Sequence, residues 1–206
     1  NDAINTGVFT GDNNVVIGKL AGQDLTSAAD NVLVGKNAGY NTTTGANNVS
    51  LGSISLEANT TGSRNTAIGA ESMNDNTTAD NNTAIGYASL SKNTTGTSNT
   101  ALGWAALEVN TTASNNIAVG HAAARSNTTG TRITAIGYAA LDGQDTENDN
   151  IAIGYNAMTT NNAGAENNIA IGNYALDAAV TGDRNVAMGH SAMTAATGAL
   201  EDTVIG

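Results

Sequence analysis

Two kinds of side chain in this 206-residue sequence could do chemistry, namely the histidines and a group of acids. His121 and His190 are the two histidines, and imidazole can act as a general base or bind a metal. Either role needs an acidic or nucleophilic partner at a fixed spacing, and none accompanies both histidines. Each directly follows a glycine, at a place where other segments have Tyr or Trp. We therefore interpret both as flat packing side chains.

The acidic group lies in "DGQDTENDN", residues 142–150. Carboxylates in a flexible turn are the hard oxygen ligands that Ca²⁺ prefers. The spacing matches neither the EF-hand loop nor the calcium-binding nonapeptide roll. The sequence therefore favours a solvated turn, and no cofactor is predicted. Calcium stays the alternative, with four candidate ligands: Asp142, Asp145, Glu147 and Asp149.

An internal repeat must position all of these residues. A glycine preceded by an aliphatic residue or Met recurs every 17 residues, with one interval of 18. A period near 20 residues, held in phase along the whole chain, is typical of a solenoid. We therefore predict one array over residues 1–206, with twelve coils of about 17 residues. Columns of the repeat are numbered from this glycine, column 0: Gly18, Gly35, Gly52, Gly69, Gly86, Gly103, Gly120, Gly137, Gly154, Gly172, Gly189 and Gly206.

The three residues before column 0 have the pattern of a short strand. Column −3 is Val, Ile or Thr, column −2 is mostly Ala, and column −1 is aliphatic or Met. Such alternation favours a strand whose large and small side chains face opposite ways. Column −1 is predicted as the structural core: Ile17, Val34, Leu51, Ile68, Ile85, Leu102, Val119, Ile136, Ile153, Ile171, Met188 and Ile205. Column −2 is predicted as an oligomer interface: Ala67, Ala84, Ala101, Ala118, Ala135, Ala152, Ala170 and Ala187.

The rest of each repeat reads as a second arm and a turn. Segments such as "YASL" and "WAAL" follow column 0, and their Ala and Leu favour a short helical turn. A second strand fits these four residues equally well. "NTTG" then supplies turn chemistry. The predicted fold class is thus all-β, a parallel β-solenoid with either kind of second arm.

Charge restricts the partners. The net charge of −11 argues against nucleic acid, because phosphate binding needs clustered Lys and Arg. No apolar run approaches the ~18 residues that span a bilayer, so we predict no membrane insertion. Between columns −4 and +4 the charged residues are Lys19, Lys36, Glu71 and Asp202. A flank so poor in charge indicates packing against other copies, and we expect a homo-oligomer.

The phrase "NTAIG", with variants "NNIAIG" and "NVAMG", resembles the repeats of trimeric autotransporter adhesin heads and of phage tail fibres. That resemblance covers the whole chain. It implies a left-handed parallel β-roll, associated as a homotrimeric rod, on a virion or bacterial surface. It also implies that Thr83 and Ile85 lie in the core and that Ala84 lies near the threefold axis. The period here is longer than that of adhesin head coils. Because no atypical coil closes either end, we expect a slice of a longer fibre.

These observations predict a structural shaft or adhesin segment of an extracellular fibre, and no enzyme. No Ser-His-Asp set, phosphate-binding loop or carboxylate pair stands out from the repeat. One alternative is direct binding of a glycan, host-surface receptor or ice on the charge-poor flank. The adjacent threonines of "NTT" disfavour ice, because in a strand they would face oppositely. Another alternative is a filament in which copies stack end to end.

Overall fold

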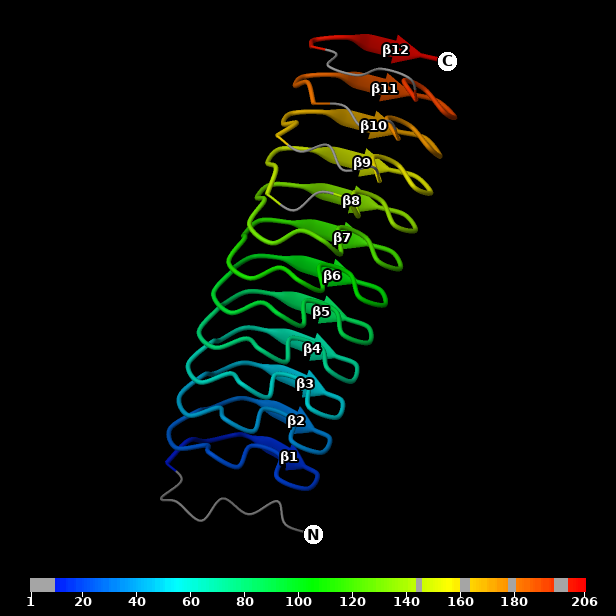
Figure 1. Cartoon of the computed structure of the whole chain (residues 1–206). Coiled ribbons are helices and arrows are strands. Elements are labelled where there is room, and N and C mark those ends of the chain that lie inside the picture. The colour runs from blue at the N-terminus through cyan, green and yellow to red at the C-terminus, as the bar shows by residue number, and fades with distance from the viewer. Residues whose placement is uncertain (1–9, 144–145, 160–163, 178–180, 195–199) are drawn as a thin grey trace.

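The computed structural model describes residues 10–143, 146–159, 164–177, 181–194 and 200–206. The chain forms a parallel β-solenoid, a rod in which coils stack one on another and the termini lie at opposite ends (Figure 1). Within these ranges there is no helix. The prediction of an all-β parallel solenoid with a 17-residue period is confirmed.

Each repeat contributes one three-residue strand, formed by columns −3 to −1. The strands make one sheet in chain order, and all neighbours are parallel. Every residue pairs with its equivalent one repeat later, so each sequence column becomes a ladder along the rod. The strands are β1 (Val15–Ile17), β2 (Val32–Val34), β3 (Val49–Leu51), β4 (Thr66–Ile68), β5 (Thr83–Ile85), β6 (Thr100–Leu102), β7 (Ile117–Val119), β8 (Thr134–Ile136), β9 (Ile151–Ile153), β10 (Ile169–Ile171), β11 (Val186–Met188) and β12 (Thr203–Ile205).

The second arm is neither a helix nor a strand. Its φ angles alternate in sign, and Ala88 and Leu90 have φ of 51° and 52°. The N–H of Ala88 donates to the carbonyl of Ala70 in the preceding coil at 3.0 Å. The N–H of Leu90 donates to the carbonyl of Ala106 in the following coil at 2.9 Å. Alternate residues therefore bond in opposite directions along the rod, which a helical turn with internal hydrogen bonds would not do.

The column 0 glycines are required by the close stacking of the coils. From Gly18 to Gly189 their φ angles lie between 122° and 153°, where L side chains are strained. A Cβ atom there would lie 1.6–2.5 Å from the carbonyl oxygen of the next column 0 glycine. Any side chain would force neighbouring coils apart, so the bend after each strand needs glycine.

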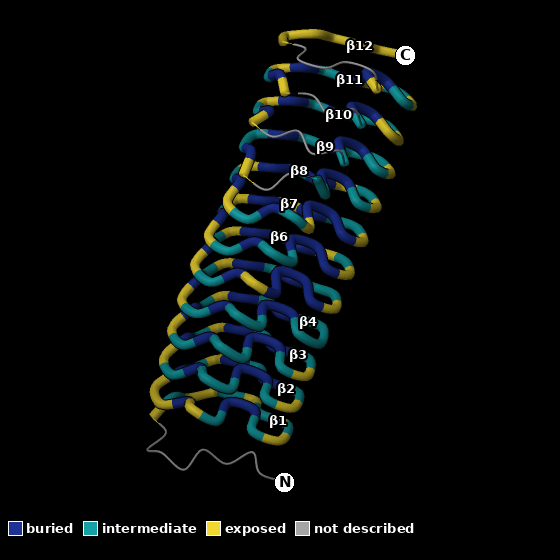
Figure 2. Tube along the Cα trace, viewed as in Figure 1, coloured by how far each residue is buried: buried dark blue, intermediate teal, exposed yellow. Residues whose placement is uncertain are grey.

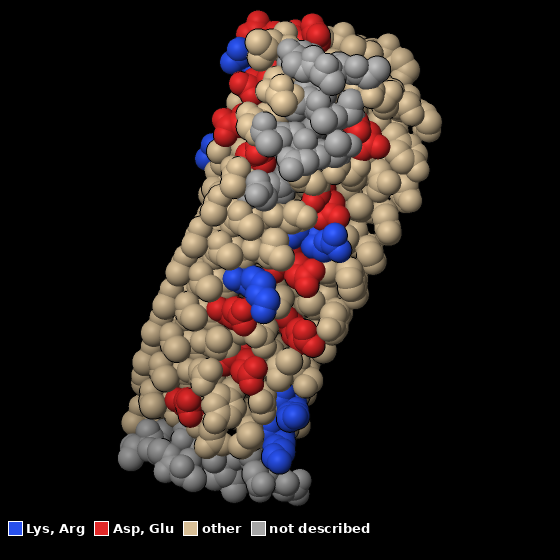
Figure 3. Space-filling model, in the orientation of Figure 1, with Lys and Arg blue, Asp and Glu red and all other residues tan. Residues whose placement is uncertain are grey.

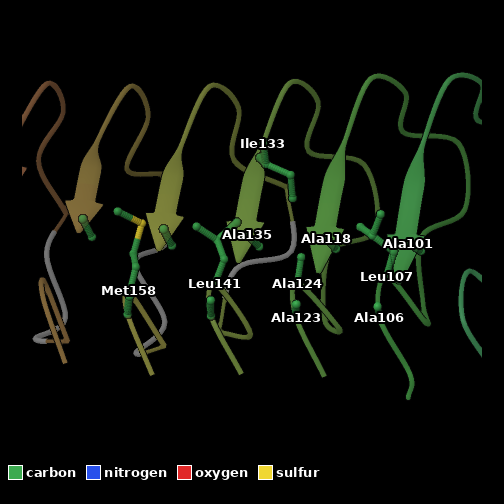
Figure 4. Packing of buried hydrophobic residues seen from close by; sticks show 14 of the residues in the cluster. Ala101, Ala106, Leu107, Ala118, Ala123, Ala124, Ile133, Ala135, Leu141 and Met158 are labelled. Carbon is green, nitrogen blue, oxygen red and sulfur yellow. The ribbon is translucent and has the colours of Figure 1, made fainter. Parts of the chain in front are cut away.

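The interior is lined by small and large side chains from opposite arms. Ala101 of β6 and Leu107 of the second arm are both 0% exposed. Equivalent residues continue the same cluster through the stack. Figure 4 shows Leu141 and Met158 reaching from the second arm toward the strands. In Figure 2 the buried positions recur at the same place from β2 to β11, whereas β12 is exposed.

This arrangement reverses the predicted roles of columns −1 and −2. The interface prediction was wrong for the eight alanines Ala67, Ala84, Ala101, Ala118, Ala135, Ala152, Ala170 and Ala187, which are all 0% exposed and lie in the chain's own core. The core prediction was wrong for Ile17, Val34, Leu51, Ile68, Ile85, Leu102, Val119, Ile136, Ile153, Ile171, Met188 and Ile205, none of which is buried. A 17-residue coil is narrow, and the Leu or Met of column +4 already fills its interior. Only a small residue fits opposite, so the larger strand side chains face outward.

Two ladders of buried asparagine complete the interior, in columns −4 and +7. The Oδ1 of Asn82 accepts from the backbone N–H of Asn99 at 2.9 Å, and its Nδ2 donates to the carbonyl of Gly96 at 2.9 Å. The Nδ2 of Asn93 donates to Oδ1 of Asn76 at 3.1 Å and to the same Gly96 carbonyl at 2.9 Å. Buried amides are tolerated because they are hydrogen-bonded. These ladders let a chain with few bulky apolar residues fill its core.

Candidate functional site

The outward side chains of the sheet form one continuous neutral surface. We call columns −3, −1 and +1 together the apolar strip. Lys19 and Lys36 are its charged residues, both near the N-terminal end of the rod. Ile17 is 59% exposed and Leu102 is 41% exposed, although both are large and aliphatic. The strip thus leaves large aliphatic side chains exposed along the sheet.

Aromatic rings stack along one edge of the apolar strip. The ring centroids of Trp104 and His121 are 4.6 Å apart, those of His121 and Tyr138 are 5.0 Å apart, and those of Tyr138 and Tyr155 are 5.1 Å apart. Tyr87 joins the stack at 6.3 Å from Trp104. Interplanar angles in this series are 10–17°. The 17-residue period causes the stack, since it places each column +1 side chain above its equivalent.

The stack presents ring edges to solvent, because neighbouring rings cover the faces. Tyr174, in column +2, and His190 continue the series with edge-on contacts of 5.4 Å and 5.9 Å. Tyr and Trp in the strip are 43–47% exposed, and Tyr174 is 37% exposed. A sugar that binds by lying on a ring face would have to separate two stacked rings. The geometry therefore suits contact with another apolar surface better than sugar stacking.

Among the described residues, neither histidine has a carboxylate partner, and His190 alone contacts a hydroxyl. His121 lies between Trp104 and Tyr138. The Nδ1 of His190 lies 3.0 Å from Oγ of Ser191, the adjacent residue on the exposed bend. Both histidines occupy the stacked edge, which agrees with their interpretation as flat packing side chains.

Two of the proposed calcium ligands pair with arginines of the preceding coil. An Asp142 carboxylate oxygen lies 3.3 Å from Arg125 Nη2, and burial raises the pKa of this Asp142 carboxyl. The Oδ1 of Asp149 accepts from Arg132 Nε at 2.6 Å, and this hydrogen bond lowers the pKa of Asp149. Such surface pairs between coils contribute little stability each. Figure 3 shows acidic and basic side chains following one another along the rod.

Of the other two proposed calcium ligands, the structure describes Glu147. Glu147 is buried, and its Oε1 accepts from the backbone N–H of Gly164 at 2.8 Å. Asp145 lies outside the described residues. In the part of the chain that the structure describes, no group of three or more His, Cys, Asp or Glu side chains is placed to hold a metal ion.

One carboxylate lies beside the aromatic stack at its first ring. The phenol of Tyr87 donates to Oε1 of Glu71 at 3.1 Å. This hydrogen bond, together with the negative charges of Glu71 and Glu108, raises the pKa of Tyr87. The phenol is therefore held in its neutral form, and the strip keeps its uncharged character there.

The threonines of the "NTT" turns lie on a different side of the coil. The hydroxyl of the first threonine donates a hydrogen bond to the next coil. The Oγ1 of Thr94 donates to the carbonyl of Thr111 in the next coil at 3.0 Å. Equivalent bonds recur along the stack. The second threonine of each turn, such as Thr95 or Thr112, is exposed. Free hydroxyls therefore form a single file here, and the regular two-column array expected for ice is not made.

No family model matches the chain, and neither a curated protein nor a solved structure shows significant similarity to it. Within the described ranges, none of the structure is a helix of the length and apolarity needed to cross a membrane. What this chain does must therefore be argued from its own surface, and the apolar strip is the feature that distinguishes it.

Sequence reasoning found the charge-poor flank but assigned its side chains wrongly. It placed the aliphatic residues inside and did not recognise that column +1 forms one stacked edge. The signal was present in the sequence, because Tyr87, Trp104, Tyr138 and Tyr155 occupy the same column in separate repeats. A ladder of parallel, in-register strands turns such a column into a stack.

Proposed function

We propose that this chain is a structural segment of an extracellular fibre on a virion or bacterial surface. Copies associate side by side through the apolar strip to make a stiff homotrimeric rod. The observation that carries the proposal is the strip itself, which is neutral and uncovered along the stacked strands. Such a rod can hold an attachment tip away from the surface, or offer many weak contacts at once.

The size of the strip fits an interface between copies. Eleven steps between the twelve strands, at ~4.8 Å each, give a length of ~53 Å. Four residue steps of ~3.3 Å from column −3 to column +1 give a width of at most ~13 Å, because the chain bends at column 0, and so an area of at most ~700 Å². A stable interface buries about 800 Å² on each partner. The largest apolar patch of an ordinary monomer is about 300–600 Å².

The two edges of the strip differ, so parallel copies related by an axis along the rod bring unlike edges together. One edge carries the aromatic stack of column +1, and the other carries Val, Ile or Thr of column −3. Unlike surfaces that bind one another head to tail generate rings when the rotation closes. Around a threefold axis, the aromatic edge of each copy meets the column −3 edge of the next. The resemblance of the repeat to trimeric adhesin heads also supports three copies in each rod.

Sedimentation of the 206-residue chain tests this proposal, with two variants in one repeat. We expect the unmodified chain to sediment as a trimer with a high frictional ratio. Leu102→Glu places a charge on the strip and should give a folded monomer. Thr112→Glu places the same charge on the exposed turn and should leave the trimer intact. A compact monomeric unmodified chain, or a trimer that tolerates Leu102→Glu, contradicts the proposal.

The same experiment separates the alternative functions. A monomer would leave the strip free for a glycan or another host-surface partner, and binding of that partner would then be the function. Species that grow steadily with concentration, without a closed size, would indicate a filament of copies stacked end to end. A trimer that is lost on charging the strip supports the lateral fibre.

A further inference from the structure

We propose that His121 makes the lateral association of the rods depend on pH, so that the copies separate as this imidazole takes up a proton. The inference rests on the proposed self-association through the apolar strip. Imidazole is the side chain whose charge ordinarily changes between about pH 5 and 8. His121 places such a group in the middle of the aromatic edge.

The surroundings of His121 are apolar and aromatic. Its ring lies between Trp104 at 4.6 Å and Tyr138 at 5.0 Å, with interplanar angles of 13° and 10°. Among the described residues, neither ring nitrogen has a hydrogen-bond or ion-pair partner. The ring faces are covered, but the side chain is exposed, so its edge faces water.

Among the described residues, no carboxylate forms an ion pair or a hydrogen bond with His121. The acids beside the aromatic edge are Glu71, which bonds Tyr87, and Glu108, which acts on the same phenol. Arg125, in the repeat of His121, pairs with Asp142 of the next repeat. Tyr138 is in ring contact with His121.

In the separated chain the stack stays in contact with water. There the ring edge keeps its contact with water, and the covering aromatic faces attract the positive charge. The indole of Trp104 is the ring type that binds cations best. A single rod can thus accept the proton and keep its fold and its stack.

Protonation of His121 costs more free energy when the copies are associated. The edge of His121 then faces column −3 of the next copy, where the level of β7 and β8 offers Ile117 and Thr134. A buried charge without a partner is costly, and threefold symmetry repeats that charge in every copy. The separated state binds protons more readily, so by linkage a falling pH favours separation.

His190 provides a matched comparison within the same chain. It lies in the same column, but Tyr174 meets it edge-on at 5.9 Å, and its Nδ1 is 3.0 Å from Ser191 Oγ. It is thus outside the parallel stack and has a polar neighbour. We expect His121 to carry most of the pH response.

Sedimentation velocity at pH 7.5 and 5.5, at one ionic strength, tests the inference. For the unmodified chain we expect the concentration at half-association to rise at least tenfold at pH 5.5. His190→Phe should keep that ratio between the two pH values. His121→Phe retains a ring and His121→Gln does not, and each should reduce the ratio below threefold. Circular dichroism checks that every variant is folded.

The outcomes distinguish this inference from the proposed function. If the unmodified chain associates equally at both pH values, or if both His121 variants keep the full response, the inference is overturned while the fibre proposal stands. Asp142→Asn, outside the strip, excludes the carboxyl whose burial raises its pKa as the source of the response. If the unmodified chain is monomeric at both pH values, the proposed function fails and this inference fails with it.

Discussion

Leu102 and Leu107 lie five residues apart in one repeat and face opposite ways. Leu107 is 0% exposed inside the coil, whereas Leu102 is 41% exposed on the apolar strip. Substituting each with Ala removes the same atoms from the two sides of the coil. The pair therefore tests directly whether the strand turns its alanine or its larger aliphatic residues into the core.

The expected losses differ by a factor of about three. Leu107→Ala removes a fully buried side chain and leaves a cavity, which typically costs about 3–4 kcal/mol of unfolding free energy. Leu102→Ala removes a side chain of which only a little over half is buried. Because full burial of Leu is worth about 2 kcal/mol and no closed cavity forms, we expect a loss of about 1 kcal/mol.

Urea unfolding followed by the fluorescence of Trp104 is the suitable assay. Trp104 is the chain's single tryptophan and belongs to the same repeat, so it reports on that coil. This matters because distant coils of a solenoid can unfold separately. The unfolding free energies should be measured over a range of protein concentrations. Any part of the Leu102 effect that comes from lost association will then disappear on dilution.

A larger loss for Leu102→Ala than for Leu107→Ala, at concentrations where the chain is monomeric, would refute the inward orientation of column −2. Equal losses would also be inconsistent with the burial of the two side chains. Ala101→Leu provides a further check, because a larger side chain in a filled interior is destabilising by about 1–3 kcal/mol. On an open interface the same change would leave the monomer unaffected.

Three further predictions concern the interior and the aromatic edge. Asn110→Ala should lower the unfolding free energy by about 2–3 kcal/mol, because it leaves the buried Oδ1 of Asn93 without its donor and removes one of the acceptors of Asn127 Nδ2, and calorimetry would measure the loss. Ala105 and Ala106 are equally buried but only Ala105 has a positive φ, 52°, so Ala105→Gly should leave an unfolding free energy about 1–2 kcal/mol higher than Ala106→Gly does in urea unfolding. Glu71→Gln should lower the pKa of Tyr87 toward that of an ordinary phenol, as seen in a spectrophotometric titration against the unmodified chain; an unchanged titration would contradict the hydrogen bond.

The period, the strand positions and the parallel stacking follow from the sequence because a repeated pattern admits few folds. The face of a three-residue strand that points inward does not follow from the sequence in the same way. Alternation states only that Ala84 faces one way and Ile85 the other, and hydrophobicity alone assigns the larger residue to the core. The interior of a short coil is instead limited by space, and Leu90 has already filled it. The second arm was unpredictable for a related reason, since its φ values are ones that Ala and Leu rarely adopt.

The apolar strip was predictable as a charge-poor flank but not as a stack of rings. Four aromatic residues and two histidines share column +1, and only the register of the sheet places them face to face. In the acidic turn, closeness in sequence does not mean that the side chains bind together. Its acids are close in sequence, yet Asp142 and Asp149 pair with arginines of the neighbouring coil.

The buried asparagine ladder of column +7 also bears on covalent modification. Asn76, Asn93 and Asn110 each begin an Asn-Thr-Thr triplet, which matches the acceptor sequence for N-linked glycans. Their side-chain amides are 0% exposed and bonded to the amides of adjacent coils. A glycan could be attached only before the coil closes, and its bulk would then prevent closure. In a host that glycosylates secreted proteins, folding and modification of this rod would therefore exclude one another, coil by coil.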